Sequence, residues 1–176
     1  VVHQGREIGE VRWPLLGRHN VMNALAALAA AHAVGLAPER LLAALADFRS
    51  VKRRMEVVGK VDGITVYDDF AHHPTAIATT LEGLRARVGG ARIVVAMEPR
   101  SNSMRLGAHA DALAPSLDTA DAVVFLHRPE LAWDAGRVVQ AVRGEAVTVP
   151  DTDALLAQLG GIARAGDHVV FMSNGG

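Results

Sequence analysis

From Pro74 onward, short apolar runs alternate with helical stretches, and this alternation limits the possible folds more than any other feature of the chain. Four apolar runs predict buried strands, at residues 93–97, 123–126, 146–149 and 169–172. The stretches around them predict helices, over residues 74–88, 106–113, 133–142 and 154–164. We expect the second of these helices to stop near Pro115 and Asp151 to cap the last. Strands and helices that alternate in this way predict a mostly parallel sheet with helices on both faces.

An Asp62-Gly63 pair separates two further strand-like segments, over residues 55–61 and 64–67. Asp-Gly between apolar runs predicts a β-hairpin, because both turn residues need a positive φ angle. The predicted fold class is therefore α/β, with a Rossmann-like, mostly parallel sheet that begins with a β-hairpin.

The first fifty residues have a different, helical pattern. A run rich in Ala and Leu predicts a helix over residues 20–34, with Asn20 as its N-cap and Gly35 in a left-handed turn at its end. A second helix is predicted to begin at Pro38, so the two helices form a helical hairpin.

The basic segment 49–54 marks the predicted domain boundary, which divides the chain into residues 1–50 and 51–176. The chain has no initiator Met and ends in a Gly-rich turn. We therefore expect a fragment of a longer protein, with the second domain truncated at its C-terminus.

Composition excludes several classes of protein. Half of the residues are apolar and 21% are charged, which favours a folded core over disorder. A net charge of -1 removes the bulk electrostatic case for binding nucleic acid or a membrane surface. No segment reaches the roughly 20 apolar residues of a membrane span. Because the chain has no cysteine, it has no disulfide and no cysteine nucleophile, and this fits a reducing compartment.

Polar side chains collect where the predicted strands end, which in an open α/β sheet is the edge that binds ligands. Residues 68–74, 98–105 and 173–176 each follow a strand. The middle loop holds Arg100 and Arg105 among small hydroxyl and amide side chains, and two arginines can hold a carboxylate or a phosphate through paired hydrogen bonds. The alternative is that these are ordinary polar loops.

Short motifs leave more than one interpretation open. Asp69 and His72 have a spacing that zinc ligands use, but no third ligand is evident, so a ribose or phosphate contact is the better hypothesis. Asn20 and Asn23 share a helix face, where they can cap the helix or match the edge of an adenine. The run Lys52–Arg54 is either a solvated surface run or a cationic hinge beside a nucleotide. The sequence contains no phosphate-binding loop and no Gly-x-Gly-x-x-Gly motif.

Three segments, in this order, resemble the Mur ligase family, whose ATP-dependent members form amide bonds in bacterial cell-wall synthesis. Residues 17–27 (Gly-Arg-His-Asn-Val-Met-Asn-Ala-Leu-Ala-Ala) are similar to the end of the family's central ATPase domain. Residues 51–56 (Val-Lys-Arg-Arg-Met-Glu) are similar to its junction with the C-terminal, glutamate-ligase-type domain. Residues 69–75 (Asp-Phe-Ala-His-His-Pro-Thr) resemble an Asp-aromatic-small-His-x-Pro segment of that second domain. The resemblance implies that residues 1–50 are a helical remnant of the central domain.

The resemblance implies two groups of binding residues. The group expected at ATP is His19, Asn20, Asn23, Arg54, Asp69 and His72. The group expected at the incoming amino substrate is Arg100, Ser101, Asn102, Ser173 and Asn174. No catalytic residue and no metal ligand is expected in this chain, because the family's phosphate loop, Mg²⁺ ligands and UDP-sugar domain are missing from it. The chain alone is therefore expected to be inactive and to contact its own missing domains.

Within the family, residues 98–107 and 171–176 are similar to the member that joins UDP-N-acetylmuramate to the recycled tripeptide L-Ala-γ-D-Glu-meso-diaminopimelate. The expected reaction is cytoplasmic and uses ATP and Mg²⁺. The sugar carboxylate attacks the γ-phosphate of ATP, and the tripeptide amine then attacks the acyl phosphate. Two alternatives stay open: the L-alanine-adding ligase of the same family, and a non-catalytic Rossmann-like module that binds an anion.

Overall fold

A computed structural model of the chain describes residues 1–129 and 131–175. The chain divides into two compact units, Val1–Val51 and Lys52–Gly176. In the part of the chain that is described, no helix is both long enough and apolar enough to cross a membrane.

The first unit is a pair of helices preceded by a small hairpin. Its elements are β1 (Val2–His3), β2 (Arg6–Glu7), α1 (Arg18–Ala33) and α2 (Pro38–Ala46). β1 and β2 pair antiparallel, and no sequence pattern predicted them. The two predicted helices are confirmed, and so is the left-handed turn, because Gly35 has a φ of 93°.

The prediction that Asn20 caps α1 is wrong. The helix begins at Arg18, and its N-cap is Gly17, with a φ of 83° that favours glycine. Asn20 lies within the first turn, where its Nδ2 donates a hydrogen bond to the carbonyl oxygen of Leu16 at 2.6 Å. The side chain therefore fastens the segment before the helix instead of accepting from the helix N–H groups.

The second unit is built on one six-stranded sheet, in the order β3-β4-β8-β5-β6-β7. The strands are β3 (Glu56–Val61), β4 (Ile64–Asp69), β5 (Ile93–Glu98), β6 (Ala122–Leu126), β7 (Glu145–Val149) and β8 (His168–Ser173). β3 pairs antiparallel with β4, and every other pairing is parallel. The hairpin turn has φ angles of 49° at Asp62 and 79° at Gly63. These observations confirm the predicted α/β class, the mostly parallel sheet and the hairpin that opens it.

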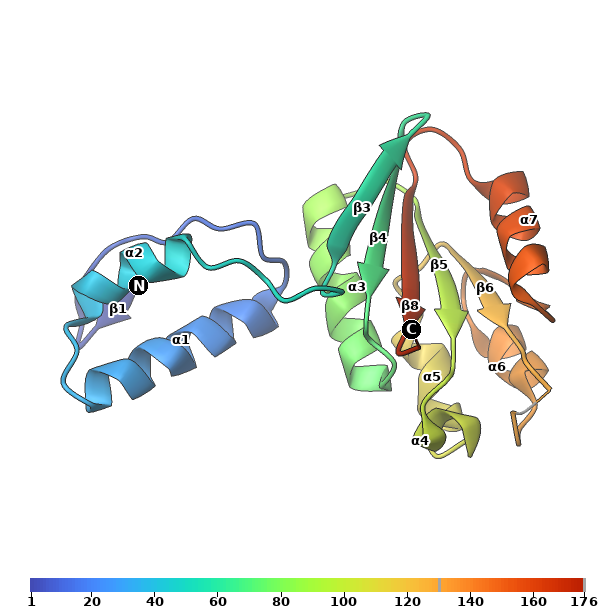
Figure 1. The fold of residues 1–176 in the computed structure, drawn as a ribbon, viewed down its shortest axis with the longest axis horizontal. Helices are drawn as coiled ribbons and strands as arrows, with labels where there is room; N and C mark the ends of the chain where they lie inside the picture. The colour runs from blue at the N-terminus through green and yellow to red at the C-terminus, as the bar shows by residue number, and fades with distance from the viewer. Residues whose placement is uncertain (130, 176) are drawn as a thin grey trace. The chain divides into compact units, whose positions relative to one another are not determined.

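Helices cover both faces of this sheet (Figure 1). They are α3 (Pro74–Val88), α4 (Asn102–Arg105), α5 (Ala110–Ser116), α6 (Ala135–Ala141) and α7 (Thr152–Ile162). Leu155 and Leu159 of α7 pack against Val94, Ala96 and Val124 on one face of the sheet. α3, α5 and α6 contact one another in turn on the opposite face. The connection through α7 returns the chain to the middle of the sheet, so β8 lies between β4 and β5.

The helix predicted over residues 106–113 is wrong in its limits. The structure has two short helices there, α4 and α5, separated at Gly107, whose φ is 75°. A Cβ at this position would lie 2.9 Å from Cδ1 of Trp133, so glycine also allows close packing. Pro115 lies in the last turn of α5, which ends at Ser116, so the predicted stop near Pro115 is confirmed. Since α5 ends one residue later, the absent N–H of Pro115 removes a hydrogen bond only from its final turn. Asp151 does cap α7, because its Oδ1 accepts from the N–H of Ala154 at 2.8 Å.

Candidate ligand site at the carboxyl edge of the sheet

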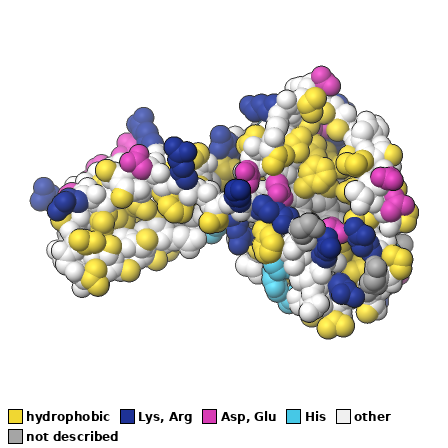
Figure 2. Space-filling view, viewed as in Figure 1, with side chains coloured by type: hydrophobic (Ala, Val, Ile, Leu, Met, Phe, Trp, Pro, Cys, Tyr) yellow, Lys and Arg dark blue, Asp and Glu magenta, His cyan; other side chains and the backbone are white. Residues whose placement is uncertain are grey.

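The parallel strands β4, β8, β5 and β6 all end at one edge of the sheet, and the chain reaches its last described residues there (Figure 1). We call this the carboxyl edge and define it by the residues that follow those strands. Basic side chains gather over the lower part of this unit, where the strands end (Figure 2). The polar loops singled out in the sequence therefore share one edge, as the topology of parallel strands requires.

Asp69, the last residue of β4, holds the backbone on both sides of it. Its Oδ2 accepts from the N–H of Met55 at 2.7 Å, and its Oδ1 accepts from the N–H of Ala71 at 2.7 Å. The residue is only 2% exposed, and burial raises the pKa of Asp69 above its ordinary value, against the two N–H donors and Arg54, which lower it. The carboxylate therefore fixes the loop that carries His72, and its contact with a ribose stays a prediction.

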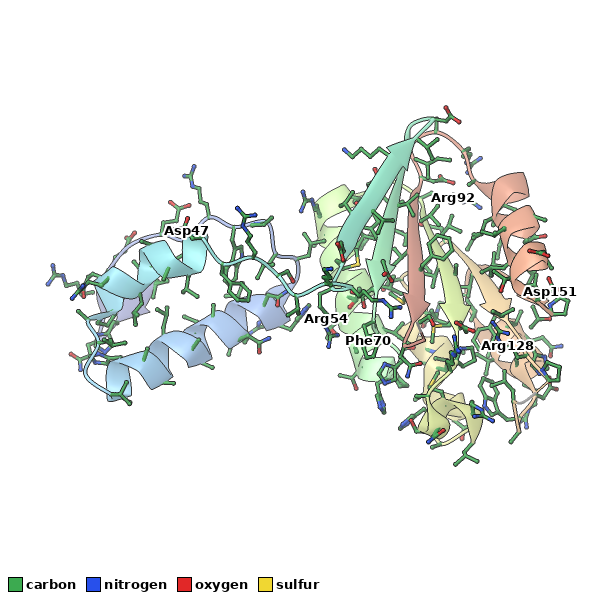
Figure 3. The ribbon with its side chains drawn as sticks, viewed as in Figure 1. Asp47, Arg54, Phe70, Arg92, Arg128 and Asp151 are labelled. Atoms are coloured by element: carbon green, nitrogen blue, oxygen red, sulfur yellow. The ribbon has the colours of Figure 1, made fainter. Side chains whose placement is uncertain are left out.

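Phe70 joins two of the predicted nucleotide residues. The guanidinium carbon of Arg54 lies 5.9 Å from the centroid of the Phe70 ring, and the His72 ring lies 5.3 Å from it, edge to face. His72 is also fixed by its Nδ1, which lies 2.9 Å from the carbonyl oxygen of Phe70. Figure 3 shows Arg54 and Phe70 together beside the end of β4. The structure thus brings Arg54, Asp69 and His72 to one place.

Arg53 is a site residue that the sequence analysis did not single out from its neighbours. Its guanidinium donates to Oδ2 of Asp68 at 3.0 Å, to the carbonyl of Ser173 at 2.7 Å and to the carbonyl of Gly175 at 2.6 Å. Arg53 therefore ties the ends of β4 and β8 together. Its φ of 58° is unusual for a residue with a side chain, and the only sequence signal was its place in a basic run at the domain boundary.

Glu98 is the second residue that was passed over. Its Oε1 accepts from Nε of Arg128 at 2.9 Å, and its Oε2 accepts from the hydroxyl of Ser173 at 2.7 Å. The same Ser173 hydroxyl accepts from the N–H of Gly175 at 3.1 Å. A chain of polar contacts therefore crosses the ends of β6, β5 and β8, and Figure 3 shows Arg128 near the end of β6. The available signal was a charged side chain at the end of β5 and another just after β6.

The predicted amino-substrate residues lie beside this chain of contacts. Arg100 packs against Gly175, in the space that a Cβ there would take. The Oδ1 atom of Asn174 is buried and, among the described residues, is the one buried side-chain nitrogen or oxygen without a hydrogen-bond partner. Ser101 instead caps the short helix α4, because its hydroxyl accepts from the N–H of Met104 at 3.3 Å, and Asn102 is exposed in the first turn.

His19, Asn20 and Asn23 all lie on α1, in the other compact unit. His19 and Asn23 are exposed, and Asn20 is half-buried with its amide bonded to Leu16. Their contact with an adenine stays a prediction.

Three histidine rings lie in contact with one another at the predicted nucleotide group, with their planes tilted or edge to face. The His73 ring centroid lies 4.9 Å from that of His72 and 4.6 Å from that of His109. Burial, together with its two histidine neighbours, lowers the pKa of His73 below its ordinary value, which favours the neutral ring. In residues 1–129 and 131–175, no group of three or more His, Cys, Asp or Glu side chains is arranged to hold a metal ion.

Residues 53–175 match the family described as "Mur ligase, glutamate ligase domain". This chain belongs to the Mur ligase family. The match includes all six strands of the sheet and every residue of the carboxyl edge described above.

Individual Mur ligases are similar along nearly the whole chain. The UDP-N-acetylmuramate–L-alanyl-γ-D-glutamyl-meso-2,6-diaminoheptandioate ligase of Escherichia coli (strain K12) is 48% identical over 177 residues, which are 100% of this chain and 39% of the relative. A UDP-N-acetylmuramate–L-alanine ligase of Mycolicibacterium smegmatis is 39% identical over 173 residues, or 94% of this chain and 36% of the relative. The solved murein peptide ligase of Psychrobacter arcticus 273-4 is 41% identical with a TM-score of 0.72, over 94% of this chain and 36% of that one. The chain thus spans about two fifths of the length of these relatives.

Proposed function

We propose that this chain is the C-terminal part of an ATP-dependent ligase that joins UDP-N-acetylmuramate to L-Ala-γ-D-Glu-meso-diaminopimelate. The observation that carries the proposal is the likeness along the whole chain, at 48% identity, to a relative whose name describes that reaction. The L-alanine-adding alternative is less favoured, because the relative of that name is 39% identical. A non-catalytic anion-binding module is not favoured, since the chain belongs to a family of ligases.

The two compact units have separate places in this proposal. Val1–Val51 is the end of the central ATP-binding domain, and Lys52–Gly176 is the C-terminal, glutamate-ligase-type domain. The phosphate loop and the Mg²⁺ ligands belong to the part of the ligase that precedes this chain. We assign no metal ligand and no catalytic residue to residues 1–176, so the chain alone is inactive. Because the reaction uses nucleotide substrates, we place it in the cytoplasm.

Each group at the carboxyl edge binds one substrate in this proposal. Arg54 approaches the phosphates of ATP, where its charge offsets theirs, and Asp69 and His72 lie at the ribose. Arg100 pairs with a carboxylate of the tripeptide through a two-pronged hydrogen bond, with hydroxyl and amide support from Ser101, Asn102, Ser173 and Asn174. A tripeptide with several carboxylates suits an edge rich in arginine better than free L-alanine does.

Phosphate release by the full-length ligase tests this proposal directly. The assay supplies ATP, Mg²⁺ and UDP-N-acetylmuramate, and compares the tripeptide with L-alanine as the acceptor. We expect tripeptide-dependent release and little release with L-alanine. Release with L-alanine alone would assign the protein to the alanine-adding step, and no release with either acceptor would overturn the ligase proposal.

Two alanine variants separate the substrate groups. Arg54→Ala should raise the KM for ATP about tenfold and leave the KM for the tripeptide near its original value, because hydrogen bonds to charged groups contribute about 1.5–3 kcal/mol. Arg100→Ala should do the reverse. Arg143→Ala is the matched control, since the Arg143 side chain is 81% exposed and, among the described residues, pairs with Asp118. Equal effects on both KM values would contradict the assignment.

A further inference from the structure

Several hydrogen bonds hold the turn formed by residues 173–175, which begins at the last residue of β8. The Ser173 hydroxyl bonds Glu98 and also accepts from the N–H of Gly175. The carbonyls of Ser173 and Gly175, which flank Asn174, both accept from the Arg53 guanidinium, at 2.7 Å and 2.6 Å. The two terminal nitrogens of one guanidinium therefore hold two backbone carbonyls of the turn that contains Asn174.

Arg53 is itself fixed from three directions. Its Nε donates to Asp68 at 3.0 Å, its backbone N–H donates to Oε2 of Glu56 at 2.9 Å, and its guanidinium carbon lies 5.4 Å from the centroid of the Phe70 ring. Its side chain is 30% exposed, so the fork is partly shielded from water. A guanidinium keeps its charge at every pH of interest and holds its donors in one plane, which suits it to fixing two carbonyls at once.

The amide oxygen of Asn174, in the same turn, has no hydrogen-bond partner among the described residues. Buried polar atoms are almost always hydrogen-bonded, and exceptions call for an explanation. Within the turn, the hydrogen bonds of Arg53 and of the Ser173 hydroxyl go to backbone atoms of residues 173 and 175, so the contacts that hold the turn do not use this atom. An amide oxygen is an acceptor only, so the group that would complete it is an N–H or O–H donor.

We propose that Arg53 is a positioning residue for the amino substrate. Its hydrogen bonds to the carbonyls of Ser173 and Gly175 place the Asn174 amide oxygen so that it accepts a hydrogen bond from an N–H group of that substrate. The oxygen is closed to water, and the donor reaches it when Arg100, which lies against Gly175, shifts toward a carboxylate of the same substrate. This inference rests on the proposed function, and it assigns to Arg53 a role distinct from that of the neighbouring Arg54.

The test compares two arginines with similar bonds at opposite edges of the sheet, in the full-length ligase. Arg92 also donates to a carboxylate and to a backbone carbonyl, those of Asp167 and Ile162, far from the carboxyl edge. We expect Arg53→Ala to raise the KM for the tripeptide about tenfold while the KM for ATP changes less than twofold. Arg92→Ala should lower the melting temperature without changing either KM. Arg53→Lys, which keeps the charge but loses the fork, should fall between Arg53→Ala and the original protein.

Asn174 supplies the second measurement. Asn174→Ala removes the acceptor and should raise the KM for the tripeptide by a similar factor, whereas Asn174→Asp keeps an oxygen at that position and should lose less. If Arg53 acts through Asn174, Arg53→Ala has little further effect in the Asn174→Ala background, because the two changes are not additive.

The outcomes separate this inference from the proposed function. If the unaltered ligase fails to use the tripeptide, the proposed function and this inference fall together. If it uses the tripeptide, but Arg53→Ala and Arg92→Ala raise its KM equally, or the effects of Arg53→Ala and Asn174→Ala simply multiply, the inference alone is overturned.

Discussion

At both edges of the sheet in the second unit, an arginine bridges a carboxylate and the backbone, but the surroundings of the two arginines differ. At the amino edge, where β5 and β8 begin, Arg92 donates to Oδ2 of Asp167 at 2.9 Å and to the carbonyl of Ile162 at 3.0 Å. The N–H of Arg164 also donates to Asp167, which is 2% exposed. At the carboxyl edge, Arg53 likewise bridges a carboxylate and backbone carbonyls.

The two edges differ in whether the polar atoms around the arginine all have hydrogen-bond partners. At the amino edge the arginine, the buried carboxylate and the local N–H groups satisfy one another. At the carboxyl edge, similar bonds hold the turn that contains the Asn174 amide oxygen, which has no partner among the residues that the structure describes, and Arg100 lies against the next residue, Gly175. Figure 3 shows Arg92 and Arg128 toward opposite ends of the strands. We interpret the amino edge as a structural edge and the carboxyl edge as the proposed ligand site, and four experiments test that division.

The largest effect should come from the amino edge. Arg92→Ala leaves the buried Asp167 carboxylate without its charged partner, and breaking such a pair costs about 3 kcal/mol of unfolding free energy. Thermal unfolding of the chain measures this loss. Arg143→Ala is the control, because it breaks a surface ion pair in which the arginine side chain is 81% exposed. This variant should change the free energy of unfolding by less than about 1 kcal/mol. Equal losses in the two variants would remove the distinction between a structural and a surface arginine.

The next effect should appear in substrate use rather than in stability. Glu98→Gln keeps the shape of the side chain but removes the charge that pairs with Arg128 and leaves one acceptor where two are used. We expect the KM for the tripeptide to rise about tenfold, equivalent to about 1.4 kcal/mol, with little change in melting temperature. Asp118→Asn, which weakens the surface pair with Arg143, is the matched control. A fall in melting temperature without a change in KM would make Glu98 part of the structural edge.

Much of the fold follows from local sequence signals. α3 has the predicted limits, Pro74 and Val88, because a proline at its first turn and Gly89 after its last define both ends. The hairpin follows from the Asp62-Gly63 pair, whose φ angles are both positive. The limits of α1 and α5 did not follow, because Gly17 and Gly107 act through backbone angles that their neighbours do not reveal.

The candidate site was predictable in outline only. Parallel strands bring their following loops to one edge, so Arg100 and Ser173 could be placed near each other from the order of elements alone. Arg53 could not be separated from Arg54, because its partners Ser173 and Gly175 lie about 120 residues away in the sequence. Glu98 was passed over for the same reason: its role depends on Arg128 and Ser173, which come from two other strands.

A smaller effect should follow from filling the space beside Arg100. Gly175→Ala puts a methyl group where the Arg100 side chain lies, and that flexible side chain must shift to make room. We expect a rise of about threefold in the KM for the tripeptide, because Arg100 keeps its charge but loses its placement. Gly160→Ala in α7, where a Cβ meets open space, should leave the KM unchanged. If both variants behave alike, Arg100 does not depend on its contact with Gly175.

The smallest expected effect is on the pH dependence of the free energy of unfolding, to which a histidine at each edge contributes. Partial removal from water lowers the pKa of His168, at the start of β8, and that of His73, at the carboxyl edge, where His72 and His109 lower it further. The folded protein therefore favours the neutral ring in both. In the unfolded chain these histidines have the ordinary pKa of 6.5, so below that pH the unfolded chain binds more protons than the folded protein does. The free energy of unfolding should therefore fall as the pH drops from 7 toward 5.

His168→Gln should flatten this fall more than His73→Gln, because His168 is half-buried with its Nδ1 2.9 Å from the hydroxyl of Tyr67, whereas His73 is exposed. Thermal unfolding of both variants at pH 7 and pH 5 measures the difference, which should stay below about 1 kcal/mol. A larger flattening by His73→Gln would place the pH-sensitive group at the carboxyl edge. That outcome would contradict the division between a structural edge and a binding edge, because the pH dependence of stability would then come from the edge assigned to a ligand.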